Sequence, residues 1–100
     1  MEDLLAFGNA LLGHRLLSPE STELLLEGKV RLNEQAQYAY GFIDRMLGNQ
    51  RVVGHGGGAP GVCCMMDIYL ERGYTRVVLS NSDSDCLVAS EAIRAVLPPQ

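Results

Sequence analysis

The first quarter of the chain has the hydrophobic period of amphipathic helices. Between residues 3 and 12, apolar side chains recur three and four positions apart, which predicts one helix. The run Ser18-Pro19-Glu20 predicts the start of a second, because serine caps helices, proline suits the first turn and glutamate suits the positive end. Gly13 and Gly28 are predicted to end these helices, and His14 to interact with the exposed carbonyls of the first.

The middle of the chain changes to the two-residue period of strands. Residues 29–37 are polar and predict a loop, whereas the alternation from Tyr38 predicts a strand through about Met46, followed by a turn at Gly48-Asn49. Residues 82–85 are rich in helix-capping side chains and predict a C-terminal helix to about Leu97, stopped by Pro98-Pro99. Three further strands are predicted at residues 50–54, 62–70 and 75–80.

This order of elements predicts an α+β fold. Short connections between successive strands require antiparallel pairing. We therefore expect an antiparallel sheet of three to four strands, flanked by two N-terminal helices and one C-terminal helix. Residues 1–100 are expected to form one domain, since neither repeats nor a linker interrupt the sequence.

Composition excludes several classes of partner. The net charge is −4 and Lys29 is the only lysine, so no basic stripe is available for nucleic acid or an anionic membrane. The sequence has no apolar run of about 20 residues and no basic amino-terminal leader, so we expect a cytoplasmic chain, although export of a longer parent protein is compatible with the sequence. We expect no metal and no cofactor, because the donors near His55 are too few.

The three cysteines predict reduced thiols. Cys63 and Cys64 are neighbours in a predicted strand and point to opposite faces, so they are not expected to bond each other. With Cys86 the count is odd and the spacing follows no disulfide framework, so we expect three mostly buried free thiols.

A glycine-rich run, Gly54 to Gly61, is the main candidate site. The sequence Gly-His-Gly-Gly-Gly-Ala-Pro-Gly lies between two predicted strands, so the backbone either turns there or allows a ligand to approach closely. A phosphate-binding loop would join a strand to a helix, which this run does not do. Outward N–H groups that stabilise an oxyanion fit better, but the G-x-S-x-G serine of lipases is absent.

Several segments together resemble a known family of enzymes. The run from Val52 to Gly61, with the following strand to Tyr69 and the segment from Val77 to Asn81, resembles the carboxy-terminal part of the serine beta-lactamase-like hydrolases. These comprise the class C beta-lactamase, D-alanyl-D-alanine peptidase and esterase group, whose fold the resemblance implies for this chain. The likeness covers nearly the whole chain, since matching segments also occur in the same order at residues 3–8, 16–20 and 38–42.

The resemblance implies roles for four residues. His55-Gly56-Gly57 would occupy the family's third motif, K-T-G or H-x-G, with His55 in an accessory catalytic role. Gly56, Gly57 and Gly58 would line the substrate, and the N–H near Gly58 would donate to the oxyanion. The family's S-x-x-K and Y-x-N motifs, which supply the nucleophile and a second catalytic group, are absent from this chain.

Three functional hypotheses follow. In the first, the chain is the C-terminal portion of such a hydrolase and is inactive without a missing N-terminal catalytic part; a cloned fragment, a truncated reading frame and a stand-alone protein remain open. In the second, it is a non-catalytic binding module that self-associates through an exposed sheet edge or an exchanged element. In the third, it is a small hydrolase that pairs His55 with Cys63 or Cys64.

Overall fold

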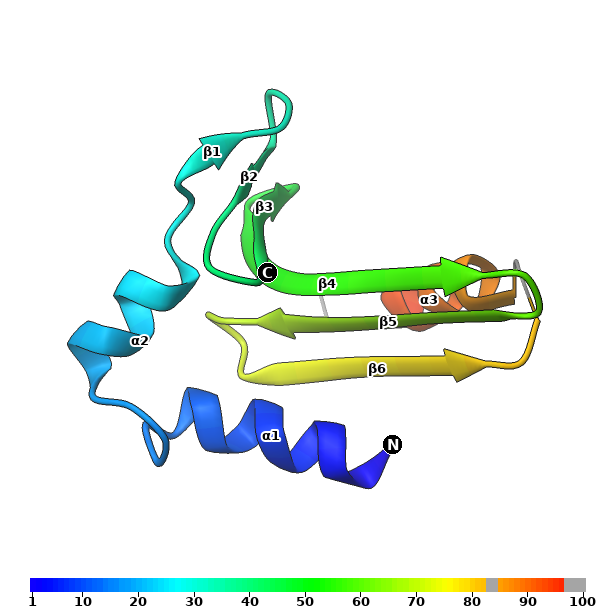
Figure 1. Cartoon of the computed structure of the whole chain (residues 1–100), viewed down its shortest axis with the longest axis horizontal. Helices are drawn as coiled ribbons and strands as arrows, with labels where there is room; N and C mark the ends of the chain where they lie inside the picture. The colour runs from blue at the N-terminus through cyan, green and yellow to red at the C-terminus, as the bar shows by residue number, and fades with distance from the viewer. Residues whose placement is uncertain (83–84, 97–100) are drawn as a thin grey trace.

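The computed structural model describes residues 1–82 and 85–96, which form three helices and a six-stranded antiparallel sheet (Figure 1). The predicted α+β class and the three flanking helices are confirmed, whereas the expected three to four strands are too few. The elements in chain order are α1 (Glu2–Leu12), α2 (Pro19–Leu26), β1 (Val30–Arg31), β2 (Ala36–Tyr38), β3 (Ile43–Leu47), β4 (Gln50–Ala59), β5 (Val62–Tyr69), β6 (Tyr74–Ser80) and α3 (Asp85–Val96).

The two additional strands lie where a loop and one long strand were predicted. β1 and β2 are short and exposed, so their polar residues gave no alternating signal. The predicted strand from Tyr38 to Met46 is interrupted at residues 39–42, where Ala39 N–H donates to the Phe42 carbonyl at 2.7 Å and Gly41 adopts φ +82°. Aromatic residues continue to alternate through this turn, so the pattern of the sequence did not reveal the interruption.

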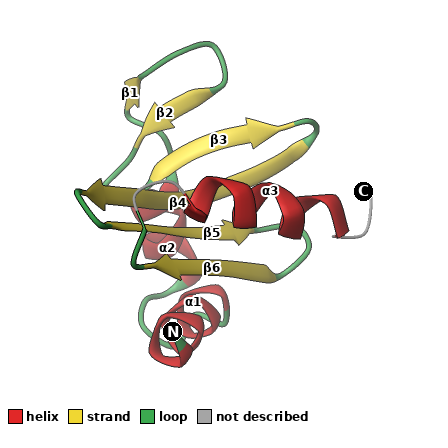
Figure 2. Ribbon diagram, turned by 90° about the vertical axis from the view of Figure 1, so that its right-hand side faces the viewer, coloured by secondary structure: helices red, strands yellow, loops and turns green. Residues whose placement is uncertain are grey.

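The sheet carries helices on both faces because β5 is apolar on both sides. One core contains Leu11, Leu26, Val53 and Ile68, and so joins α1 and α2 to β4 and β5. Residues of opposite parity on β5 pack with β6 and α3 in a second core, formed by Cys63, Met65, Val78, Cys86, Ala89 and Ile93. Figure 2 shows α3 in front of the strands, with α2 behind them and α1 beside β6.

Cys63 and Cys86 form a disulfide, which corrects the prediction of three free thiols. The expected alternation explains the pairing: Cys63 points toward α3, which carries Cys86, whereas Cys64 points to the other face and remains free. The odd count of cysteines was therefore misleading, because only one of the two adjacent cysteines faces a partner.

The helix ends lie close to the predicted positions, but His14 rather than Gly13 adopts the positive φ after α1. Ser18 caps α2 as predicted, accepting a hydrogen bond from Ser21 N–H at 3.1 Å. α1 ends at Leu12 with Gly13 as its C-cap, but the positive φ of +56° belongs to His14, whose Nδ1 lies 3.4 Å from the Thr22 hydroxyl. α2 ends at Leu26, before Gly28. Residues 83–84 and 97–100, which include parts of the predicted cap and helix stop, lie outside the described residues. Within the described residues, the helices are too short or too polar to cross a bilayer.

Candidate functional site

The glycine-rich run is a strand rather than a turn. β4 extends through Ala59, and the reversal into β5 occurs at Pro60-Gly61, where Gly61 has φ +82°. Gly56, Gly57 and Gly58 are not among the positive-φ residues, so the backbone conformation does not require glycine at these positions. The interpretation of the whole run as a hairpin turn is therefore wrong.

Within the strand part of the run, Gly54 is the glycine that internal packing requires. A Cβ at this position would overlap the Met66 carbonyl and lie 2.6 Å from the Asp67 carboxylate. By contrast, a Cβ at Gly58 would lie 3.7 Å from its nearest neighbour, the Val62 carbonyl, which is ordinary contact. The run therefore contains a glycine required by packing at Gly54 and one favoured by the turn at Gly61, and between them glycines that internal packing constrains less.

The register of the sheet leaves the second half of β4 with a free edge. Pairing of β3 with β4 ends at Ile43 opposite Gly54, whereas pairing with β5 continues to Ala59 opposite Val62. Within the described part of the chain, residues 55–59 thus have a strand on one side only. Alternate residues of an antiparallel strand present both N–H and C=O to the same side, so this edge offers backbone groups to an incoming ligand.

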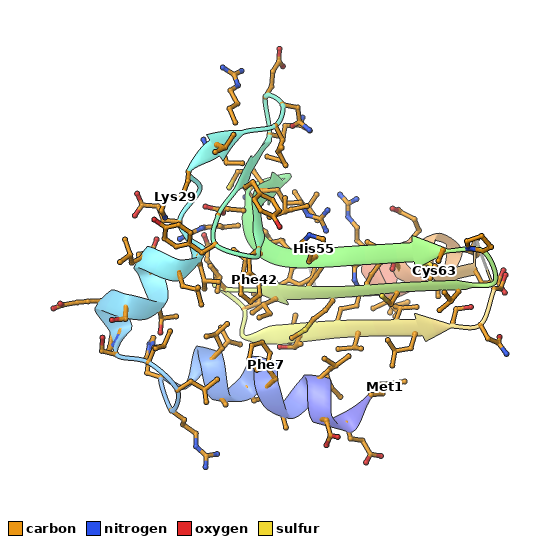
Figure 3. The ribbon with its side chains drawn as sticks, in the orientation of Figure 1. Met1, Phe7, Lys29, Phe42, His55 and Cys63 are labelled. Carbon is orange, nitrogen blue, oxygen red and sulfur yellow. A yellow bond between two sulfur atoms is a disulfide. The ribbon has the colours of Figure 1, made fainter. Side chains whose placement is uncertain are left out.

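His55 lies on β4 near the point where β3 leaves it, as Figure 3 shows. Its Nδ1 lies 2.6 Å from the Gly56 carbonyl oxygen. Its Nε2 lies 3.4 Å from the hydroxyl of Tyr38, and the two rings meet edge to face with centroids 5.9 Å apart. The imidazole is exposed, so it is available to a ligand on the free edge.

A cavity of about 260 Å³ adjoins His55 on the side of α1. The free thiol of Cys64 contributes to its lining, whereas Cys63 is held in the disulfide and cannot serve as a nucleophile. The hypothesis of a small hydrolase is therefore wrong for the pair His55–Cys63, which leaves the pair His55–Cys64. The lining residues are Leu4, His55, Gly56, Gly57, Cys64, Met65, Met66 and Leu79.

A buried ion cluster lies beside Gly54, at the start of the predicted site. Asp67, opposite Gly54 on β5, accepts hydrogen bonds from Arg76 and, at 2.7 Å, from Arg45. The Asp67 and Arg76 side chains are 3% and 6% exposed, so their charges are compensated by each other and by Arg45. Arg76 also donates to the Ser90 carbonyl at 3.0 Å and thereby connects the sheet to α3.

A second ion cluster fixes the first half of β4. Arg51 bonds Asp44 at 3.0 Å and Glu23 at 2.9 Å, joining β4 to β3 and α2. Partial burial acts to lower the pKa of Arg51, but the hydrogen bonds and charges of Asp44 and Glu23 outweigh it and raise that pKa above its ordinary value. Arg51 is therefore a permanent cation within the framework.

The serine side chains of the described residues do not pair with a base; the hydroxyl–histidine contacts found there are those of Thr22 with His14 and of Tyr38 with His55. Ser18 caps α2, Ser80 accepts from Ser82 N–H at 3.1 Å, and the Ser90 hydroxyl lies 3.2 Å from the Met65 sulfur. Among residues 1–82 and 85–96, we find neither a serine hydroxyl bonded to histidine or lysine nor three or more metal-ligating side chains grouped together.

Sequence reasoning missed Tyr38 as a neighbour of His55. The two residues are 17 positions apart and lie on strands that are not adjacent in the sheet. The sequence predicted Tyr38 only as the first residue of an alternating strand, and its proximity to His55 depends on the turn at residues 39–42.

Comparisons with known proteins confirm the predicted resemblance, and each match covers only part of the other protein. The chain is 35% identical over 86 residues to penicillin-binding protein 4* of Bacillus subtilis (strain 168), a match covering 83% of this chain and 19% of that protein. A crystal structure of a penicillin binding protein from Bacillus halodurans superimposes with a TM-score of 0.87 and 28% identity, covering 96% of this chain and 30% of that one.

The structural likeness extends to an amidohydrolase. A D-stereospecific amidohydrolase from Streptomyces sp. matches with a TM-score of 0.70 and 27% identity over 82% of this chain and 25% of that one. No protein-family model matches. The chain therefore spans about a fifth to less than a third of the lengths of these proteins.

Proposed function

Because the chain matches part of the beta-lactamase-like family of penicillin-binding proteins and amidohydrolases, we propose that it supplies the substrate-binding strand of a serine acyl-transfer site. His55 would act in the accessory role of the third motif, and the N–H near Gly58 would donate to the oxyanion. The nucleophile would come from a separate or upstream part that carries S-x-x-K and Y-x-N. The chain alone is then inactive.

The observation that carries this proposal is the free edge of β4 at residues 55–59. An acyl substrate that extends along this edge would form backbone hydrogen bonds as an added strand. Side chains on Gly56, Gly57 and Gly58 would obstruct that approach, whereas the internal packing around Gly58 leaves room for a Cβ. The absence of side chains therefore has a better explanation in ligand access than in the fold.

The direct test replaces the matching segment of penicillin-binding protein 4* with the corresponding residues of this chain. We expect the chimera to be labelled by a fluorescent penicillin, and Gly58→Val to slow labelling by about 100-fold or more, as expected when reacting groups are displaced. His55→Gln should also slow labelling, while His14→Gln, which changes a histidine that contacts Thr22 and does not line the cavity beside His55, is the matched control. Equal rates for Gly58→Val and the parent chimera would contradict the proposal.

The isolated chain provides the complementary measurement. Neither fluorescent penicillin nor a fluorophosphonate should label it, because the chain lacks an S-x-x-K serine and its hydrogen-bonded serines do not contact a base. Stoichiometric labelling of a serine would overturn this part of the proposal, and labelling of Cys64 that is lost on His55→Ala would favour the small-hydrolase hypothesis.

A second candidate function is self-association of two copies through the edge of β6. β6 is the last strand in the sheet order, so its outer side has no strand partner within the described residues, and α1, which packs beside it, would be the element that two copies exchange or displace. Leu79 on this strand is 47% exposed. Exposed apolar edge strands tend to pair with other chains, and a charged side chain on the edge opposes such pairing.

Sedimentation velocity tests this second candidate. We expect a dimer at micromolar concentration that Leu79→Lys converts to monomer, while Val96→Lys, a change on the exposed surface of α3, leaves it intact. A clean monomer of the parent chain at these concentrations would contradict self-association.

A further inference from the structure

Tyr38 lies close to His55 because the β2–β3 pairing and the β3–β4 pairing both end at Ile43. Tyr38 is opposite Ile43 at the end of the β2–β3 pairing, and Ile43 is opposite Gly54 at the end of the β3–β4 pairing. His55 is the next residue after Gly54 and therefore lies just past the end of β3. The Tyr38 side chain can therefore extend past the end of β3 to the imidazole, and its hydroxyl lies 3.4 Å from Nε2.

The contacts of the His55 ring specify its tautomer. A carbonyl oxygen only accepts hydrogen bonds, so the 2.6 Å contact with Gly56 requires that Nδ1 carry the proton. In the neutral imidazole, Nε2 then has the lone pair and acts as the acceptor. The Tyr38 hydroxyl is a donor at that position, so the two contacts are mutually consistent and hold both nitrogens of the ring.

We propose that Tyr38 is a positioning residue for His55, holding it as the Nδ1–H tautomer with the basic Nε2 at the start of the free edge of β4. The catalytic consequence rests on the proposed function, whereas the tautomer is a property of this chain alone. The edge-to-face packing of the rings restricts rotation of the imidazole about its Cβ bond. A base whose lone pair has a fixed direction loses less freedom when it takes up a proton.

Tyr40 provides a matched control two residues away. Its ring lies under the Lys29 ammonium, with Nζ 4.8 Å from the ring centroid, and it is 58% exposed. Tyr38→Phe and Tyr40→Phe each delete one phenolic hydroxyl while keeping the ring. Only Tyr38→Phe should affect His55.

The tautomer can be measured by long-range proton–nitrogen NMR of the full chain at a pH where both imidazoles are neutral. We expect His55 to be predominantly Nδ1–H in the parent and in Tyr40→Phe, and to shift toward the mixture of a free imidazole in Tyr38→Phe. His14 serves as an internal reference that should not change. A predominantly Nε2–H form of His55 in the parent chain would overturn the proposal without any variant, as would identical spectra of the parent and Tyr38→Phe.

The penicillin-labelled chimera separates this inference from the proposed function. There, Tyr38→Phe should slow labelling about tenfold, the loss expected for one hydrogen bond, with unchanged final stoichiometry. If the chimera is never labelled but the tautomer shifts in Tyr38→Phe, the proposed function fails while the positioning of His55 stands. If labelling occurs and Tyr38→Phe changes neither the tautomer nor the rate, the inference about Tyr38 is wrong.

Discussion

The two halves of strand β4 are continuous in backbone but opposite in environment. Residues 50–54 pair with β3, residues 52–54 also pair with β5, and Val52 and Val53 are fully buried. Residues 55–59 pair with β5 alone and are exposed. One strand therefore forms both part of the core and an edge that is open to a ligand.

This difference shows that neighbouring glycines can be present for different reasons. Gly54 is required because the β5 backbone and Asp67 occupy the space where a Cβ would lie. Gly58 has room for a Cβ within the fold, so packing does not require glycine there, and ligand access is the reason that we propose for its small size. Substitutions in the two halves of β4 should therefore differ in their effect on the free energy of unfolding, with the largest loss expected at Gly54 and the smallest at Gly58.

Gly54→Ala should have the largest effect. A single added Cβ overlaps the Met66 carbonyl, and relief of this overlap would require β4 and β5 to separate. We expect a loss of about 4 kcal/mol or more in the free energy of unfolding, the range associated with severe steric disruption. Urea denaturation followed by circular dichroism would measure it, and a loss below about 1 kcal/mol would contradict the structural role of Gly54.

Asp67→Asn should come next, at about 3 kcal/mol, because it removes the buried negative charge that compensates Arg76 and Arg45. The same denaturation experiment measures the loss. Asp44→Asn is a useful comparison, since Asp44 is more exposed and its partner Arg51 retains Glu23. Equal losses for the two variants would show that burial does not distinguish the clusters.

Arg51→Gln should cost about 1 kcal/mol. Its ion pairs join β4 to α2 and β3, but Arg51 and Glu23 are substantially exposed to solvent, which screens their attraction. The loss should decrease when denaturation is repeated in about 1 M sodium chloride. A loss independent of salt would indicate that Arg51 acts through packing of its aliphatic stem instead.

Gly58→Ala should have the smallest effect on stability, within about 0.5 kcal/mol of the parent, because the fold has room for the Cβ and alanine restricts the unfolded chain. The change is chemically the same as Gly54→Ala, four positions away on the same strand. Thermal unfolding of the two variants side by side gives the sharpest comparison. If both were strongly destabilised, the glycines of the second half would be structural as well.

The sequence predicted those parts of the fold whose signals are local. α2 has a serine cap, the helices have apolar residues at helical spacing, and β5 is a long apolar run, so these elements were recognised. β1 and β2 were missed because they are short, exposed and stabilised by pairing with neighbours. The Cys63–Cys86 disulfide was missed because it depends on which face of β5 is covered by α3.

For the candidate site, the composition of the run drew attention to it, and the family resemblance, carried by the order of segments, made His55 and Gly56 to Gly58 candidates. The distinction between Gly54 and Gly58 could not be made, since it depends on the distance to β5 in the folded chain. The proximity of Tyr38 to His55 likewise depends on where two pairs of strands stop in register.

The sequential order of the strands has a consequence for how such a sheet arises. All six described strands come from one contiguous stretch, residues 30–80, and each pairs with its neighbour in the chain. Such a meander closes only short loops, so it has low contact order and is expected to form rapidly. Because every strand pair lies within this stretch, the whole sheet and the proposed substrate-binding edge on β4 are encoded by one continuous segment of the chain.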